Sequence, residues 1–234
     1  RLMAKGFIIN GFNPMVLLFW IGTISIAKGQ LGYTGNREAI IFLASIIVTV
    51  FTELFGLQTY IVNGVRSKSA KGRIALYQPL TLLDLVVYYK ENANIKRIKE
   101  IRCLHQYQTL QTDIRKASIG MFINEILNKT VKEENHAQEM FDFFLDSLIM
   151  LDDQQTDFEN FHLIFLIKLS RFLGFGAHES DEVLTRRLTG KEEETLLKRL
   201  IAGEYGDTFT MTNTQRRNLL EILLRFYSAH IDSL

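Results

Sequence analysis

Two clusters of basic residues could bind the phosphates of a nucleic acid. The first consists of Arg66, Lys68, Lys71 and Arg73, and the second of Lys96, Arg97, Lys99 and Arg102. Four tyrosines lie near the clusters in the sequence: Tyr60, Tyr77, Tyr88 and Tyr89. Cations neutralise phosphates and unpaired bases stack on aromatic rings, so this combination is typical of a surface that binds single-stranded nucleic acid. The alternative is a solvated basic face with the tyrosines in the core.

No other set of residues points to a reaction. The five histidines show no metal-ligand spacing, and His178 with Glu179 and Asp181 is better explained as a solvated loop. The single cysteine, Cys103, excludes an internal disulfide and a multi-cysteine zinc site. We therefore expect no catalysis, no metal and no cofactor.

The net charge of +1 hides an uneven distribution. Residues 56–102 contain nine basic and three acidic residues, a net charge of +6. Residues 103–234 contain 14 basic and 21 acidic residues, a net charge of −7. This division predicts a module that faces a polyanion, joined to an acidic module.

The basic module shows the pattern of short strands. Residues 57–62 alternate, with Leu57, Thr59 and Ile61 on one face and Gln58, Tyr60 and Val62 on the other. Residues 81–90 are rich in β-branched and aromatic residues, and a further strand pattern covers residues 95–102. Several short strands with tight connections predict a small barrel.

The acidic module has helical periodicity throughout. Residues 158–174, "FENFHLIFLIKLSRFLG", are apolar on nearly all sides and predict a central buried helix that ends at Gly174. Thr212 and Gln215 form a capping-box pattern that opens the last helix.

The first part of the chain is apolar and has two explanations. Residues 7–27 are about long enough to cross a bilayer, which needs ~20 residues, although Pro14 interrupts them. Residues 39–52 form a second, shorter uncharged run. Both could also be buried core elements. Residues 46–51 alternate as a strand would, and we predict a strand there.

From about Thr52 the chain resembles the RecO family of bacterial recombination mediators, in the form found in Bacteroidetes. The resemblance rests on "TELFGLQTYIVNGVRSK", "LYQPLTLLDLVVYYKENANIKRIKEIR", "DIRKASIGMFINEIL" and "NLLEILLRFYSAHI". It implies an OB-fold that binds DNA, a helical second domain and annealing of complementary strands. It also implies work with RecR, and loading of RecA onto strands coated by single-strand binding protein.

By position, Arg66, Ser67 and Lys68 fall in the family's basic loop. The residues that we expect to contact single- or double-stranded DNA are Arg66, Ser67, Lys68, Lys71, Arg73, Lys96, Arg97 and Lys99. Tyr60 and Tyr88 are the candidates for base stacking. Some relatives carry a four-cysteine zinc site, which a chain with Cys103 alone lacks. The resemblance implies a cytoplasmic protein associated with the nucleoid.

Residues 4–51 instead resemble the LysE/RhtB family of amino-acid exporters, through "KGFIINGFNPMVLLFWIG" and "IIFLASIIVTVF". The family's Asn-Pro-Lys element is here Asn13-Pro14-Met15, without the lysine. The resemblance predicts that an exporter fragment replaces the first barrel strand. The alternative function is accordingly that of an exporter fragment fused to a repair module. In that case the repair module is either inactive or held at the membrane through residues 7–52.

The predicted fold is α+β in three parts. An apolar, exporter-like helical segment covers residues 1–45, an incomplete OB-fold barrel covers 46–104, and an α-helical domain covers 105–234. Because an OB-fold without one strand leaves an edge unpaired, this organisation predicts a weakly folded barrel.

Overall fold

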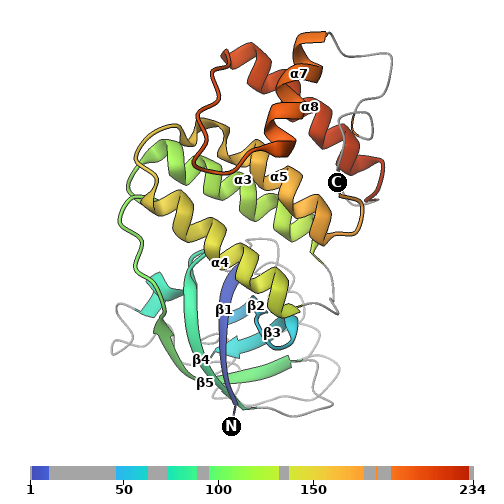
Figure 1. The fold of residues 1–234 in the computed structure, drawn as a ribbon. Helices are drawn as coiled ribbons and strands as arrows, with labels where there is room; N and C mark the ends of the chain where they lie inside the picture. The colour runs from blue at the N-terminus through green and yellow to red at the C-terminus, as the bar shows by residue number, and fades with distance from the viewer. Residues whose placement is uncertain are drawn as a thin grey trace, which may run out of the picture. The chain divides into compact units, whose positions relative to one another are not determined.

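The computed structural model describes residues 2–10, 46–62, 73–88, 95–131, 137–176, 183 and 191–231 (Figure 1). Five strands come first in the chain: β1 (Leu2–Asn10), β2 (Ile46–Thr52), β3 (Gly56–Val62), β4 (Leu82–Tyr88) and β5 (Ile95–Cys103). The helices are η2 (Arg73–Tyr77), α3 (Ile114–Thr130), α4 (Ala137–Asp153), η3 (Phe158–Asn160), α5 (Phe161–Phe172), α7 (Lys191–Ala202) and α8 (Asn213–Ser228). The predicted α+β class, a barrel followed by helices, is confirmed.

The chain divides into two compact units. The barrel unit comprises residues 1–106 and 133–142, and the helical unit comprises residues 107–132 and 143–234. The first turns of α4 therefore belong to the barrel unit. Among the described helices, none combines the length and the hydropathy that a bilayer-spanning segment requires.

The five strands form a closed barrel in the order β1-β2-β3-β5-β4. β3 and β5 pair in parallel over three residue pairs, and the other neighbouring strands pair antiparallel. This small closed barrel has the architecture of an OB-fold. The strand predicted over residues 46–51 is confirmed as β2, paired along its whole length with β3.

The prediction of an incomplete barrel was wrong, because β1 supplies the missing strand. Its residues pair with β4 from Leu2 to Phe7 and with β2 from Gly6 to Asn10. Residues 4–10 therefore form a barrel strand and not the start of an exporter-like helix. The rest of the predicted helical segment, residues 11–45, lies outside the described residues.

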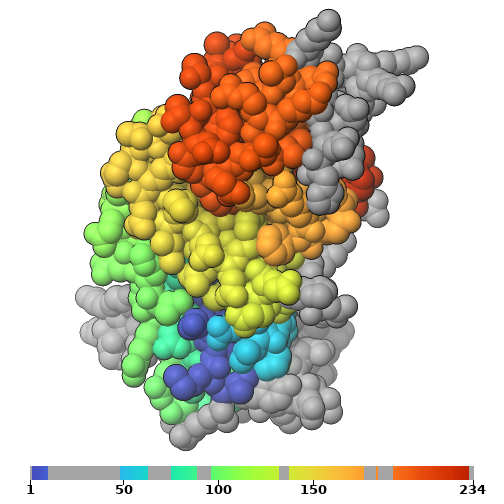
Figure 2. Space-filling view, in the orientation of Figure 1, coloured from blue at the N-terminus to red at the C-terminus, as the bar shows by residue number. Residues whose placement is uncertain are grey.

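Strand β1 looked helical in the sequence because both of its faces are apolar. Ile8 points into the barrel core, whereas Phe7 points outward and is nevertheless fully buried. The Phe7 ring packs against Phe51 of β2, at 5.7 Å between centroids, and against Phe141 of α4, at 6.3 Å. Because Phe51 and Phe141 cover the outward face of β1, that face is apolar. The strand therefore lacks the alternation of apolar and polar residues that marks a half-exposed strand. Figure 2 shows β1, in dark blue, beside the cyan β2–β3 hairpin at the surface of the barrel unit.

The helical unit is built around α5, as predicted. Eight of the twelve residues of α5 are buried, and Gly174 follows the helix with a φ of 83°, a left-handed conformation that favours glycine. The predicted capping box of α8 is confirmed: the Thr212 side chain accepts from the backbone N–H of Gln215, and the Gln215 side chain accepts from that of Thr212. Both terminal features satisfy backbone groups that a helix end leaves unpaired.

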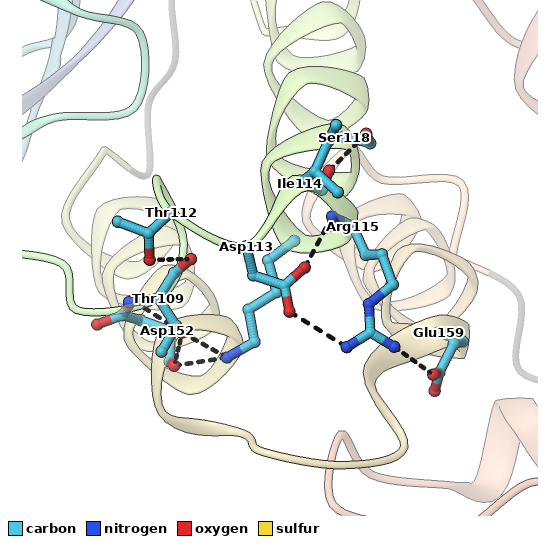
Figure 3. A network of polar contacts seen from close by, with 9 residues as sticks. Thr109, Thr112, Asp113, Ile114, Arg115, Ser118, Asp152 and Glu159 are labelled. Atoms are coloured by element: carbon cyan, nitrogen blue, oxygen red, sulfur yellow. Dashed lines mark hydrogen bonds and ion pairs between the residues drawn. The ribbon is translucent and has the colours of Figure 1, made fainter.

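A buried polar network fixes the start of the helical unit (Figure 3). The Asp152 carboxylate accepts hydrogen bonds from the backbone N–H groups of Gln108, Thr109 and Leu110, at 2.7 to 3.1 Å. Lys116, only 2% exposed, donates to the Thr109 hydroxyl at 2.6 Å and to the Asp152 carbonyl at 2.7 Å. Burial lowers the pKa of Lys116, and the Asp152 carboxylate opposes that shift. The network satisfies polar groups that would be costly to bury unpaired.

Candidate nucleic-acid interface

Strands β4 and β5 carry an exposed aromatic and cationic surface. Tyr88 on β4 is the register partner of Arg97 on β5, and both side chains are exposed. Residues directly opposite each other on paired strands point to the same side of a sheet. We call Tyr88, Arg97, Lys99 and Arg102 together the β4–β5 face.

A β-bulge in β5 keeps Arg102 on the same solvent side as Arg97. Val87 pairs with Ile98 and Val86 with Glu100, so Lys99 has no register partner on β4. The extra residue shifts the alternation of the strand. Ile98 is buried on one side of the bulge, while Arg97, Lys99 and Arg102 are all exposed.

Acidic side chains reduce the positive charge of this surface. Lys99 forms an ion pair with Glu100, at 2.5 Å between Nζ and Oε1. Asp84 lies between two cations in register, opposite Lys5 on β1 and opposite Arg102 on β5. Of the predicted contact residues, Lys99 therefore has part of its charge offset by a neighbour.

Lys96 lies apart from this face, at the rim of the barrel. Its register partner on β3 is Tyr60, whose side chain points into the core. The Lys96 ammonium donates to Gln58 Oε1 at 2.6 Å and lies 5.1 Å from the centroid of the Phe55 ring. Sequence reasoning missed Phe55 and Gln58, because only the strand pairing brings them to Lys96.

Tyr60 is enclosed in the barrel and does not present its ring to a base. It is fully buried, its hydroxyl has no hydrogen-bond partner among the described residues, and burial raises its pKa to about 12. The two faces of β3 were correctly separated in the sequence, but alternation alone does not say which face points inward. Tyr88, with 46% of its surface exposed, is accessible for stacking.

The loop residues Arg66, Ser67, Lys68 and Lys71 lie outside the described residues. Arg73 begins η2, and its side chain also lies outside the described part of the structure. Their DNA contacts stay predictions. β3, the strand before this loop, ends at Val62.

The cations of the helical unit are largely engaged within that unit. Ion pairs join Lys168 to Glu204, Lys198 to Glu194 and Arg225 to Glu221. Arg115 pairs with Asp113 and Glu159. Within the described ranges no three acidic, histidine or cysteine side chains are placed to hold a metal ion. These four cations of the helical unit therefore have part of their charge offset by carboxylates of the same unit.

Comparison with known proteins identifies both parts of the chain. The family model "Recombination protein O N terminal" matches residues 44–107, and "Recombination protein O C terminal" matches residues 111–193. The chain is 33% identical over 204 residues to the DNA repair protein RecO of Flavobacterium johnsoniae, covering 80% of this chain and 86% of the relative. It is 30% identical over 205 residues to that of Bacteroides fragilis, covering 79% and 85% respectively. It is 31% identical over 228 residues to that of Phocaeicola vulgatus, covering 89% and 91%. These matches give no support to the exporter resemblance.

Proposed function

Because the chain belongs to the RecO family of DNA repair and recombination proteins, we propose that it binds single-stranded DNA on the β4–β5 face and anneals complementary strands. The observation that carries this proposal is the exposed pair of Tyr88 on β4 and Arg97 on β5. Lys99 and Arg102 lie farther along β5 and are also exposed. Arginine and lysine neutralise phosphates, and a base of any type can stack on the tyrosine ring.

This mode of binding suits annealing. Phosphate contacts position a strand and carry no sequence information, and stacking tolerates every base. The hydrogen-bonding edges of the bound bases are then left for the complementary strand. The double-stranded product keeps its phosphates on the same cations. No covalent bond is formed or broken, so the proposed activity is not enzymatic and needs no cofactor.

The proposed partners follow from family membership and from the charge of the helical unit. We expect RecR to join the protein on DNA, and the pair to help RecA replace single-strand binding protein. The acidic excess of residues 103–234 makes this half a poor surface for DNA and leaves it for protein contacts. Because we propose that the protein acts on DNA, we expect it to be associated with the nucleoid.

A salt-titrated binding assay on the full chain tests the proposal. The fluorescence anisotropy of a labelled mixed-sequence oligonucleotide gives the affinity, and mixing with its complement gives the annealing rate. We expect log K to fall linearly with log salt, with a slope of about 0.7 for each phosphate neutralised. Annealing should exceed the spontaneous rate. Absence of binding at low salt, or binding without faster annealing, would contradict the proposal.

A further inference from the structure

The contacts of Lys96 at the barrel rim suggest a role for an uncharged neighbour. Lys96 is in register with Tyr60 across the parallel pair of β5 and β3. Gln58 precedes Tyr60 by two residues, so its side chain points to the same side of β3. The two polar side chains meet there, at 2.6 Å between Lys96 Nζ and Gln58 Oε1.

The orientation of the Gln58 amide is fixed by the turn beside it. Its Nε2 group donates to the carbonyl oxygen of Phe55 at 3.0 Å and to that of Leu57 at 2.9 Å. An amide nitrogen has two hydrogens and no acceptor capacity, so both are used. If the amide were flipped, its oxygen would lie against the two carbonyl oxygens and its NH₂ group would lie against the Lys96 ammonium. Both contacts would be unfavourable, because they bring acceptor to acceptor and donor to donor. Oε1 is therefore the atom presented to Lys96.

Gln58 and Phe55 hold the ammonium without adding a negative charge. Oε1 accepts from it, and the Phe55 ring lies 5.1 Å away, within cation–π distance. Lys99 is held differently, by the carboxylate of Glu100. A lysine side chain loses much rotamer freedom when it contacts a phosphate, and a side chain that is already ordered loses less.

We propose that Gln58 is a positioning residue for DNA binding: it orders the Lys96 ammonium at the barrel rim so that Lys96 contacts a phosphate of the bound strand. The proposal rests on the proposed function, since it assigns a further contact of the same DNA strand. It differs from a purely structural role because Gln58 acts through the charge of Lys96. Removing Gln58 should weaken binding while the number of neutralised phosphates stays the same.

The test uses the full chain, the labelled oligonucleotide and four variants: Gln58→Met, Lys96→Gln, their double variant and Gln155→Met. Gln155 is an exposed residue of the helical unit and serves as the control for the glutamine-to-methionine change. We expect Gln58→Met to lower affinity about threefold to tenfold with an unchanged salt slope. Lys96→Gln should lower the affinity and also reduce the slope by about 0.7. The double variant should bind no more weakly than Lys96→Gln.

Each other result has a separate meaning. Binding by Gln58→Met at the level of Gln155→Met, or effects that add in full in the double variant, would overturn the positioning role. A wild-type protein that does not bind DNA would overturn the proposed function itself. If Gln58→Met fails to fold, Gln58→Glu replaces it, because it keeps the acceptor and adds a charge. We expect Gln58→Glu to reduce the salt slope as Lys96→Gln does, and an unchanged slope would overturn the proposal.

Discussion

Tyr88 and Arg97 lie directly opposite each other on β4 and β5, with both side chains exposed on the outside of the barrel. The pair combines a π-face for a base with a cation for a phosphate on two rigid neighbouring strands. A site on paired strands is held more precisely than a site on a loop. Tyr88 and Arg97 are therefore the residues of the β4–β5 face at which DNA binding is best tested.

Substitutions in this pair should separate stacking from charge. Tyr88→Leu should weaken binding of single-stranded DNA by about 1–3 kcal/mol without changing its salt slope, because it removes the ring and no charge. Arg97→Gln should weaken binding and reduce the slope by about 0.7. Anisotropy titrations over a range of salt measure both quantities. Tyr60→Phe is the control, since it alters a buried tyrosine and should leave DNA affinity unchanged; equal effects of Tyr60→Phe and Tyr88→Leu would refute the assignment.

Removing a carboxylate from the same surface should strengthen binding. Glu100 pairs with Lys99, so Glu100→Gln releases the charge of Lys99 and removes repulsion of phosphates. We expect a higher affinity at low salt, a gain that shrinks as salt rises, and a steeper slope. Glu125→Gln, which breaks the pair with Lys129 in the helical unit, is the control and should have no effect. A gain of the same size from both variants would point to net charge alone.

Much of the architecture could be predicted from the sequence, because its signals are local. The alternation of β3, the apolar surface of α5 and the capping box at Thr212 are each encoded within a few residues. Strand β1 was missed because its outward Phe7 is covered by Phe141, a residue far along the chain. A pattern of exposed and buried positions carries no information about such cover.

The site was predictable in composition but not in arrangement. The sequence shows that Arg97 and Tyr88 are both present, and only the register makes them neighbours. Tyr60 was assigned to the surface because alternation defines two faces without saying which is inside. Gln58 is uncharged and belongs to no recognisable motif, so its contact with Lys96 becomes visible only once β3 is paired with β5.

The buried network of the helical unit should make Asp152 far more important for stability than its neighbour Asp153. Asp152→Ala leaves the three backbone N–H groups of residues 108–110 without their acceptor and removes the carboxylate beside buried Lys116. We expect a loss of about 3–5 kcal/mol in the free energy of unfolding. Asp153 is exposed, and Asp153→Ala should change stability by no more than about 0.5 kcal/mol. Urea titrations followed by circular dichroism compare the two, and similar losses would contradict the role of the network.

His162 should make the stability of the helical unit depend on pH. Burial, and secondarily the charge of Arg216, lowers the pKa of His162 from 6.5 to about 4, although a backbone hydrogen bond at Glu159 opposes the shift. Between these values the unfolded chain binds a proton that the folded protein does not. The contribution of neutral His162 to the free energy of unfolding is therefore fully present above about pH 6.5. It is lost as pH falls towards 4, and the total loss is about 3 kcal/mol.

The matched variant for this titration is His162→Gln, which removes the ionisable group. Urea titrations of both proteins from neutral pH to about pH 4.5 give the free energy of unfolding at each step. The difference between the two curves isolates His162, because every other titrating group is common to both. The wild-type curve should fall more steeply than that of the variant. Parallel curves would show that the protonated imidazole is accommodated in the folded protein.

The closing strand β1 can be tested at Gly6, where it lies against β2. A Cβ atom at position 6 would come within 2.6 Å of Val50 Cγ1 and 3.0 Å of the Phe51 carbonyl oxygen, so a larger residue must displace the Val50 side chain and crowd the backbone of β2. Gly6→Val should destabilise the barrel unit by about 1–3 kcal/mol. Lys5→Val, at the neighbouring position whose side chain is half-exposed, should change stability by no more than about 0.5 kcal/mol. Hydrogen exchange of the β2 and β4 amides should speed up in Gly6→Val alone. Equal stability of the two variants would mean that residues 2–10 do not complete the barrel.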